Sequence, residues 1–78
     1  MNIKNLEIKK IEDFFKKEIK INPNNPEANF NLARVYKDKG DYQKAKFFYE
    51  KTIKIQPKNY SAYNNLANIY KLMGDFSK

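Results

Sequence analysis

Carboxylates, amines and carboxamides are the side chains with which this 78-residue chain could do chemistry, because the sequence contains no histidine and no cysteine. That absence excludes disulfides, thiol chemistry, zinc sites and histidine-based acid–base catalysis. Glu12 and Asp13 are adjacent, and paired carboxylates can bind a metal or move protons. Lys16 and Lys17 follow at helical spacing, which favours solvated ion pairs instead. We therefore expect no enzyme activity, no cofactor and no metal site.

The net charge of +7 suggests an anionic partner such as nucleic acid or an anionic lipid surface. The lysines are spread along the whole chain, however, and Arg34 is the single arginine. Eleven asparagines and eight isoleucines accompany them, which indicates a compositional bias and disfavours nucleic-acid binding. The best basic candidate surface consists of Lys9, Lys10, Lys16, Lys17 and Lys20. No apolar run approaches membrane-spanning length and no signal-peptide core is present, so we expect no membrane partner and a cytoplasmic location.

A period of about 34 residues organises the sequence. Residues 26–44 and 60–78 are identical at 9 of 19 positions, and the shared segments include Asn31-Leu32-Ala33 with Asn65-Leu66-Ala67. The same offset backwards matches Phe14 with Phe48 and Pro23 with Pro57. A period of this length indicates a stack of helical repeats.

Apolar spacing, capping residues and breakers predict four helices, at about residues 5–21, 26–39, 42–55 and 60–73. Asn25 and Asp41 are predicted N-caps, and Gly40 is expected to take a positive φ where the second helix ends. The first helix is expected to bury one apolar face, formed by Ile8, Ile11, Phe15 and Ile19. Small side chains at Ala33, Ala67 and Ala45 are expected to let paired helices approach closely.

The central repeat carries a small residue, Leu followed by a small residue, an aromatic, Gly-Asp-Tyr, Ala, an aromatic and Pro at set intervals. These residues are Ala28, Leu32, Ala33, Tyr36, Gly40-Asp41-Tyr42, Ala45, Tyr49 and Pro57. This pattern resembles the tetratricopeptide repeat family, with two departures: Asn29 stands where a large apolar residue is usual, and Thr52 where Ala is usual. The resemblance implies an all-α fold of helix-turn-helix repeats stacked as an α-solenoid fragment.

The resemblance also implies a division of the chain. Residues 1–25 are expected to be the second helix of an incomplete repeat, 26–59 a complete repeat, and 60–78 the first helix and turn of another. The last helix would then lack a partner and expose Leu66, Ile69, Tyr70 and Met73. Such an apolar face favours self-association.

In tetratricopeptide proteins the first helix of each repeat lines a concave groove that binds peptides. The implied groove residues are Glu27, Phe30, Asn31, Arg34, Lys37 and Asp38 in one such helix, then Ser61, Asn64, Asn65, Asn68, Lys71 and Leu72 in the next. Asn31 and Asn65 occupy equivalent positions, and each carboxamide could pair with the backbone of an extended peptide. They resemble the asparagine ladder of the O-linked N-acetylglucosamine transferase superhelix, although solvated asparagines that bind nothing are an equal alternative.

Basic residues that would clamp a C-terminal carboxylate are missing, since Glu27 and Ser61 occupy those positions. The resemblance therefore implies a scaffold for protein–protein interaction whose partner is a protein or an extended peptide. Three alternatives stay open at this point: a purely architectural or self-associating module, targeting repeats of a larger enzyme such as a glycosyltransferase, and a lysine-driven surface for nucleic acid or lipid.

Overall fold

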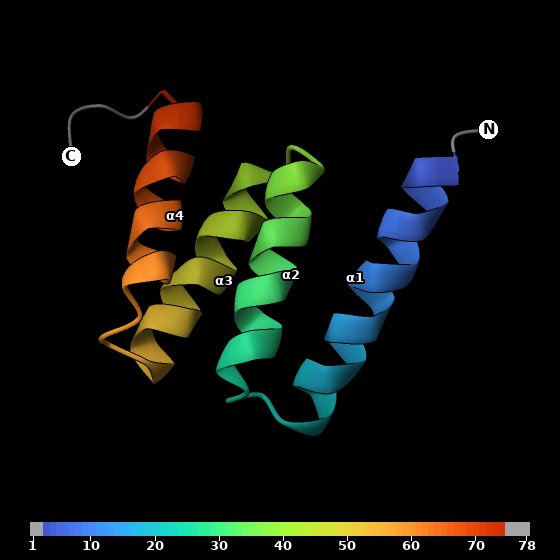
Figure 1. The fold of residues 1–78 in the computed structure, drawn as a ribbon, viewed down its shortest axis with the longest axis horizontal. Coiled ribbons are helices and arrows are strands. Elements are labelled where there is room, and N and C mark those ends of the chain that lie inside the picture. Colours follow the sequence, from blue (N-terminus) through green and yellow to red (C-terminus); the bar gives the residue numbers. More distant parts are fainter. Residues whose placement is uncertain (1–2, 75–78) are drawn as a thin grey trace.

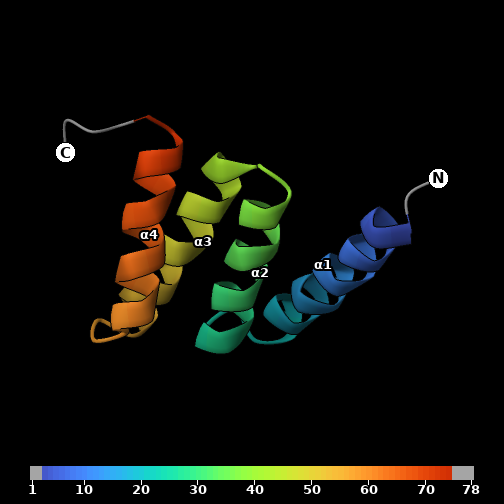
Figure 2. The same ribbon diagram turned by 45° about the horizontal axis from the view of Figure 1, so that its top comes forward.

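A computed structural model describes residues 3–74, which form four helices joined by short turns. The helices are α1 (Ile3–Ile21), α2 (Pro26–Asp38), α3 (Tyr42–Ile55) and α4 (Tyr60–Leu72), and no strand occurs in this part of the chain. Each helix packs against the next along the sequence, and α3 lies behind α2 and α4 (Figure 1). A second view shows α1 inclined away from α2 towards its N-terminal end (Figure 2). The predicted all-α fold is confirmed.

The helices begin and end where their capping residues predict. Asn25 Oδ1 accepts a hydrogen bond from the Ala28 amide at 3.1 Å. Asp41 Oδ1 accepts one from the Lys44 amide at 3.3 Å. Gly40 and Gly74, which occupy equivalent positions in the repeat, have φ of 82° and 75°, a conformation that costs glycine little because it has no Cβ. The predicted boundaries hold to within two residues.

The core lies between α2 and α3, and two alanines set its width. Ala33 on α2 and Ala45 on α3 are both 0% exposed, as predicted. Aromatic rings close the space around them: Tyr36 stacks on Phe48, with ring centroids 5.7 Å apart and planes 18° apart. A methyl group at each alanine lets the helix axes approach closely enough for these rings to meet.

The prediction for Ala67 was wrong, and so was the predicted exposed face of α4. Ala67 is exposed, because no helix within residues 3–74 covers that side of α4. Ile69 is fully buried, and Leu66 and Met73 pack against the core, because α3 covers their side of the helix. The exposed apolar side chains of α4 are instead Tyr60, Tyr63, Ala67 and Leu72.

One residue of the predicted apolar face of α1 is also misplaced. Ile8, Phe15 and Ile19 pack against the core, but Ile11 is 48% exposed. Glu12 is buried in its place, at 5% exposure. The face of α1 that packs on α2 therefore includes a buried acidic residue, Glu12, which belongs to a polar cluster between the two helices.

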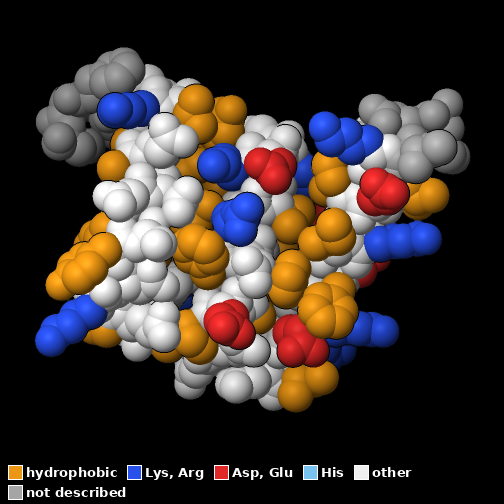
Figure 3. Space-filling view, viewed as in Figure 1, with side chains coloured by type: hydrophobic (Ala, Val, Ile, Leu, Met, Phe, Trp, Pro, Cys, Tyr) orange, Lys and Arg blue, Asp and Glu red, His pale blue; other side chains and the backbone are white. Residues whose placement is uncertain are grey.

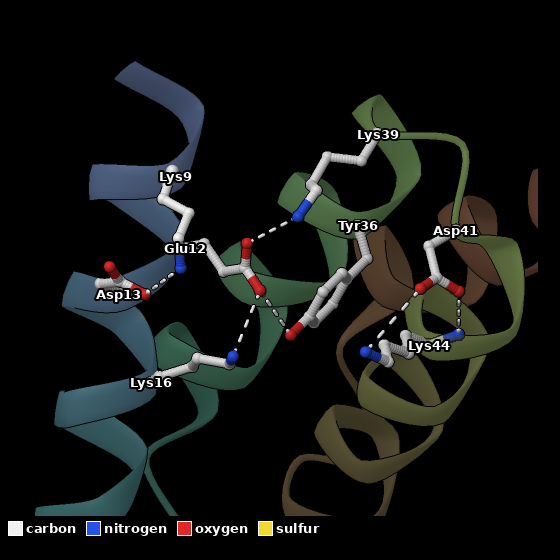
Figure 4. A network of polar contacts seen from close by, with 8 residues as sticks. All are labelled: Lys9, Glu12, Asp13, Lys16, Tyr36, Lys39, Asp41 and Lys44. Carbon is white, nitrogen blue, oxygen red and sulfur yellow. Dashed lines mark hydrogen bonds and ion pairs between the residues drawn. The ribbon is translucent and has the colours of Figure 1, made fainter. Parts of the chain in front are cut away.

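That cluster is centred on the Glu12 carboxylate (Figure 4). Glu12 Oε2 accepts a hydrogen bond from the Tyr36 hydroxyl at 2.9 Å, and Oε1 accepts one from Lys39 Nζ at 2.7 Å. Lys16 Nζ lies 3.3 Å from Oε2. Burial raises the pKa of Glu12, but hydrogen bonds from Lys39, Tyr36 and Lys16 and the charge of Lys39 outweigh burial and lower it to about 2.

The interpretation of Glu12 as a solvated residue is thus wrong, although its pairing with Lys16 is confirmed. Asp13 is exposed as predicted, but it pairs with Lys9 at 3.4 Å and not with Lys17. Local spacing thus identified Lys16 as a partner of Glu12. It could not reveal Tyr36 and Lys39, which lie 24 and 27 positions further along the chain, on or just after α2.

Asn29, a departure from the family pattern, anchors the turn before α2. Its side chain is fully buried, and Nδ2 donates hydrogen bonds to the Pro23 and Asn25 carbonyl oxygens at 3.1 and 2.8 Å. Asn29 therefore has a structural role at the position where the family usually carries a large apolar residue. Its amide holds two carbonyls of the turn that joins α1 to α2.

We expect Asn29→Ala to lower the free energy of unfolding by about 1–3 kcal/mol, because both carbonyls lose a donor. Urea denaturation followed by circular dichroism measures the change. Asn24→Ala in the same turn is a suitable control, because Asn24 is exposed. Equal stabilities for the two variants would contradict an anchoring role for Asn29.

Candidate functional site

A hollow of about 450 Å³ lies between the N-terminal halves of α2 and α4. Glu27, Phe30 and Asn31 line it from α2, and Ser61 lines it from α4. These four belong to the predicted groove, and the fold brings them together from two successive repeats. The hollow has a partly apolar wall because the ring of Phe30 packs edge-on against Tyr49, with centroids 5.6 Å apart.

The other predicted groove residues do not line this hollow. Arg34 and Asp38 are exposed and Lys37 is partly buried further along α2. On α4, Asn65 is partly buried, and Asn64, Asn68, Lys71 and Leu72 are exposed. In Figure 3, charged side chains of both signs lie along α2, whereas α4 shows mostly uncharged polar surface. Three basic residues and two acidic ones leave the predicted groove with a slight positive charge.

The two repeated asparagines differ in their hydrogen bonding. Asn65 Nδ2 donates to the Ser61 carbonyl oxygen at 2.8 Å, so one of its two amide hydrogens is used within α4. Asn31 is half-buried at the hollow and makes no side-chain hydrogen bond within residues 3–74. Asn31 can therefore offer both amide hydrogens and its Oδ1, whereas Asn65 offers its Oδ1 and one remaining amide hydrogen.

Sequence reasoning missed the residues that close the hollow. Pro26, at the first position of α2, and Gln56 and Asn59, from the turn between α3 and α4, also line it. Asn59 Nδ2 donates to Gln56 Oε1 at 2.9 Å, which holds the turn in place. Asn59 is the N-cap of α4 and lies one repeat after Asn25, but nothing in the sequence indicated that a capping turn would form a wall of the hollow.

Tyr49 lies beneath Phe30, and it is fully buried with a hydroxyl that has no partner among residues 3–74. Burial raises its pKa to about 12; Arg34 opposes the shift and Asp38 adds to it. The hydroxyl therefore stays protonated at neutral pH and supports the wall of the hollow as a neutral aromatic.

No group of three or more metal-ligating side chains occurs within residues 3–74. In the same part of the chain, no helix combines the length and the apolar character needed to cross a bilayer. Among the residues that line the hollow, Glu27 supplies a carboxylate and Asn31, Gln56 and Asn59 supply carboxamides, so the arrangement suits binding through hydrogen bonds and side-chain contacts.

A family model described as tetratricopeptide repeat matches residues 14–47 and again residues 48–78. The second match begins one internal period after the first, and together they include most of the chain. The chain belongs to the tetratricopeptide repeat family. None of the curated proteins compared with it matches.

Tetratricopeptide repeats generally mediate protein–protein interaction and are typically non-catalytic modules. In this tetratricopeptide chain, α2 and α4 carry equivalent segments one period apart, and the hollow lies between them. Membership of the family accordingly gives the chain a general role in binding proteins. The hollow is the place on its surface where four of the predicted groove residues lie together.

Proposed function

We propose that the concave face of α2 and α4 binds an extended segment of a partner protein. The observation that carries this proposal is the hollow, which joins Glu27, Phe30 and Asn31 of α2 to Ser61 of α4. Its volume of about 450 Å³ lies in the range of roughly 300–1,000 Å³ that ligand pockets occupy. Partly apolar walls with a few polar groups are typical of such sites.

Hydrogen bonds to the peptide backbone are the proposed source of general affinity. Asn31 would donate to a backbone carbonyl and accept from an amide, and Asn65 Oδ1 would accept from an amide further along the segment. This arrangement resembles the asparagine ladder of the O-linked N-acetylglucosamine transferase superhelix in a reduced form. The Asn65–Ser61 hydrogen bond supports the proposal, because it orients the carboxamide from its own helix.

The side chains around the hollow favour an internal segment over a C-terminal tail. Glu27 would repel a terminal carboxylate, and Phe30 offers an apolar surface. A basic or apolar side chain of the partner is the proposed occupant of the hollow, with Glu27 supplying the complementary charge.

We expect the double substitution Asn31→Ala and Asn65→Ala to weaken binding of an extended peptide by about 1–3 kcal/mol in total. Each lost carboxamide leaves a backbone group of the bound peptide unpaired. The measurement is calorimetric titration of a peptide selected from a random library, at two salt concentrations. Asn24→Ala is the matched control, because Asn24 is exposed and does not line the hollow.

Folding of the double variant should be nearly unchanged, since neither asparagine belongs to the core. Equal affinities for the wild type and the double variant would show that the two asparagines are solvated and do not contact the peptide. A collapse of wild-type binding at the higher salt concentration would favour a lysine-driven surface, because neutral hydrogen bonds depend little on salt.

A further inference from the structure

Each end of the described chain presents an apolar face that no helix within residues 3–74 covers. On α4 this face includes Tyr63, 45% exposed, and Ala67. On α1 it includes Ile11 and Phe14, 48% and 57% exposed. Exposed aromatic and branched side chains grouped on one helix face mark a surface that associates.

The internal repeat shows that these two faces are the halves of an interface that the chain already forms once. Ala67 is equivalent to Ala33, and Ile11 is equivalent to Ala45, each pair being one period apart. Ala33 and Ala45 are both fully buried in the contact between α2 and α3. The open side of α4 thus matches the side of α2 that receives α3, and the open side of α1 matches α3.

An aromatic pair follows the same equivalence. Tyr36 on α2 stacks on Phe48 on α3. Their equivalents are Tyr70, half-buried on α4, and Phe14, exposed on α1. Tyr70 already contacts α3 as Tyr36 contacts α1: its hydroxyl lies 3.4 Å from the carboxylate of Glu50, and Lys46 Nζ lies 5.6 Å from its ring. Within residues 3–74, no aromatic ring stacks on Tyr70 as Phe48 does on Tyr36.

We propose that α1 of a second copy docks on α4 in the position that α3 takes on α2. Phe14 of the second copy then stacks on Tyr70, and Ile11 of the second copy lies against Ala67. Because isoleucine is larger than Ala45, this contact is wider than the internal one, and the association is weaker than the packing of α3 on α2. This inference does not depend on the groove.

The two docking faces differ, so the interface is heterologous and leaves one face open at each end of the assembly. Such an interface produces chains of copies that lengthen with concentration and do not stop at a dimer. Each added copy continues the stack of helices.

The test uses three variants of the full chain in sedimentation equilibrium over about a hundredfold range of concentration. Phe14→Lys blocks the α1 face, and Ala67→Lys blocks the α4 face. Phe47→Lys is the matched control, because Phe47 on α3 is 59% exposed but lies on the outward side of the core. All three positions are exposed, so the variants should fold like the wild type.

We expect the wild type and Phe47→Lys to show a mean mass that rises without a plateau. Phe14→Lys and Ala67→Lys should each associate at least tenfold more weakly than the wild type. An equimolar mixture of these two variants should form a one-to-one dimer and stop there, since each retains one intact face. Every variant keeps the full chain, so that the blocking substitution is the only difference from the wild type.

Three outcomes would overturn the proposal. A wild type that stays monomeric throughout would show that a second copy does not occupy these faces. Association that survives both blocking variants would place the contact elsewhere. Failure of the mixed variants to form a dimer would contradict the pairing of α4 with α1.

Discussion

Replacing Ala33 by leucine is expected to destabilise the fold by roughly 1–3 kcal/mol or slightly more, whereas the same replacement at Ala67 should change stability very little. The two alanines are equivalent in the repeat and lie on equivalent helices. Ala33 is fully buried against α3, and Ala67 is exposed. Three extra heavy atoms at Ala33 force α2 and α3 apart and break the stack of Tyr36 on Phe48. At Ala67 they extend into solvent.

Urea denaturation of both variants at low protein concentration measures this difference, because dilution keeps association from contributing. Thermal unfolding should show the same order, with a lower Tm for Ala33→Leu alone. Ala45→Leu tests the other side of the same contact and should resemble Ala33→Leu. A loss of stability at Ala67 equal to that at Ala33 would mean that α4 is covered on both sides, contrary to the described structure.

Glu12→Gln is the second substitution with a large expected effect, a loss of about 2–3 kcal/mol of stability. Breaking a fully buried ion pair costs roughly 3–5 kcal/mol, because one charge stays buried without its partner. The cost is smaller at Glu12, because the ammonium groups of Lys39 and Lys16 are partly exposed and can return to water. Glutamine can still accept the Tyr36 hydrogen bond, so Glu12→Ala should be the more damaging change.

Glu50→Gln is the matched control for this prediction. Glu50 accepts a hydrogen bond from Tyr70 at 3.4 Å at the equivalent junction between α3 and α4, but that contact is exposed. Surface contacts of this kind contribute about 0–1 kcal/mol. Denaturation curves for the two glutamine variants therefore compare a buried with an exposed tyrosine–carboxylate contact, and equal losses would contradict the burial of Glu12.

The Glu12 carboxylate also makes the free energy of unfolding depend on pH. The pKa of Glu12 is about 2 in the folded chain and 4.5 as its ordinary value, so the unfolded state binds the proton more tightly. Its contribution is complete above pH 4.5 and is lost as the pH falls towards 2, by an amount on the order of 3 kcal/mol. The difference in stability between the wild type and Glu12→Gln should narrow across this window. A constant difference would show that Glu12 is not the titrating group.

The fold follows from local features that can be read along the chain. Asn25, Asp41 and Gly40 mark helix ends through hydrogen bonds and backbone conformations that involve residues within a few positions. The internal period also predicts which helices pair, because equivalent residues such as Ala33 make equivalent contacts in each repeat whose two helices are both present. These interactions are short in sequence or repeated in it, so the pattern of residues suffices to predict them.

The candidate site was predicted less completely. The resemblance to tetratricopeptide proteins implied a groove, and four of its residues meet at the hollow: Glu27, Phe30, Asn31 and Ser61. The wall supplied by Gln56 and Asn59 was missed. Whether the turn that carries them lines the hollow depends on the angle at which α3 and α4 pack, and the sequence does not show that angle. The unequal bonding of the two repeated asparagines was also invisible, since one hydrogen bond depends on the rotamer that Asn65 adopts in α4.

Capping chemistry and apolar periodicity act within a few residues, so the number of helices, their boundaries, the repeat and the family could all be read from the sequence alone. The burial of side chains on α1 and α4 could not be read from the sequence, because it depends on which helices pack together. Glu12 is buried because α2 brings Tyr36 and Lys39 to it, and Ala67 is exposed because no helix in the described chain lies against it. Whether a side chain is buried depends on the helix that packs against it as much as on its own type, and that helix is known only from the tertiary structure.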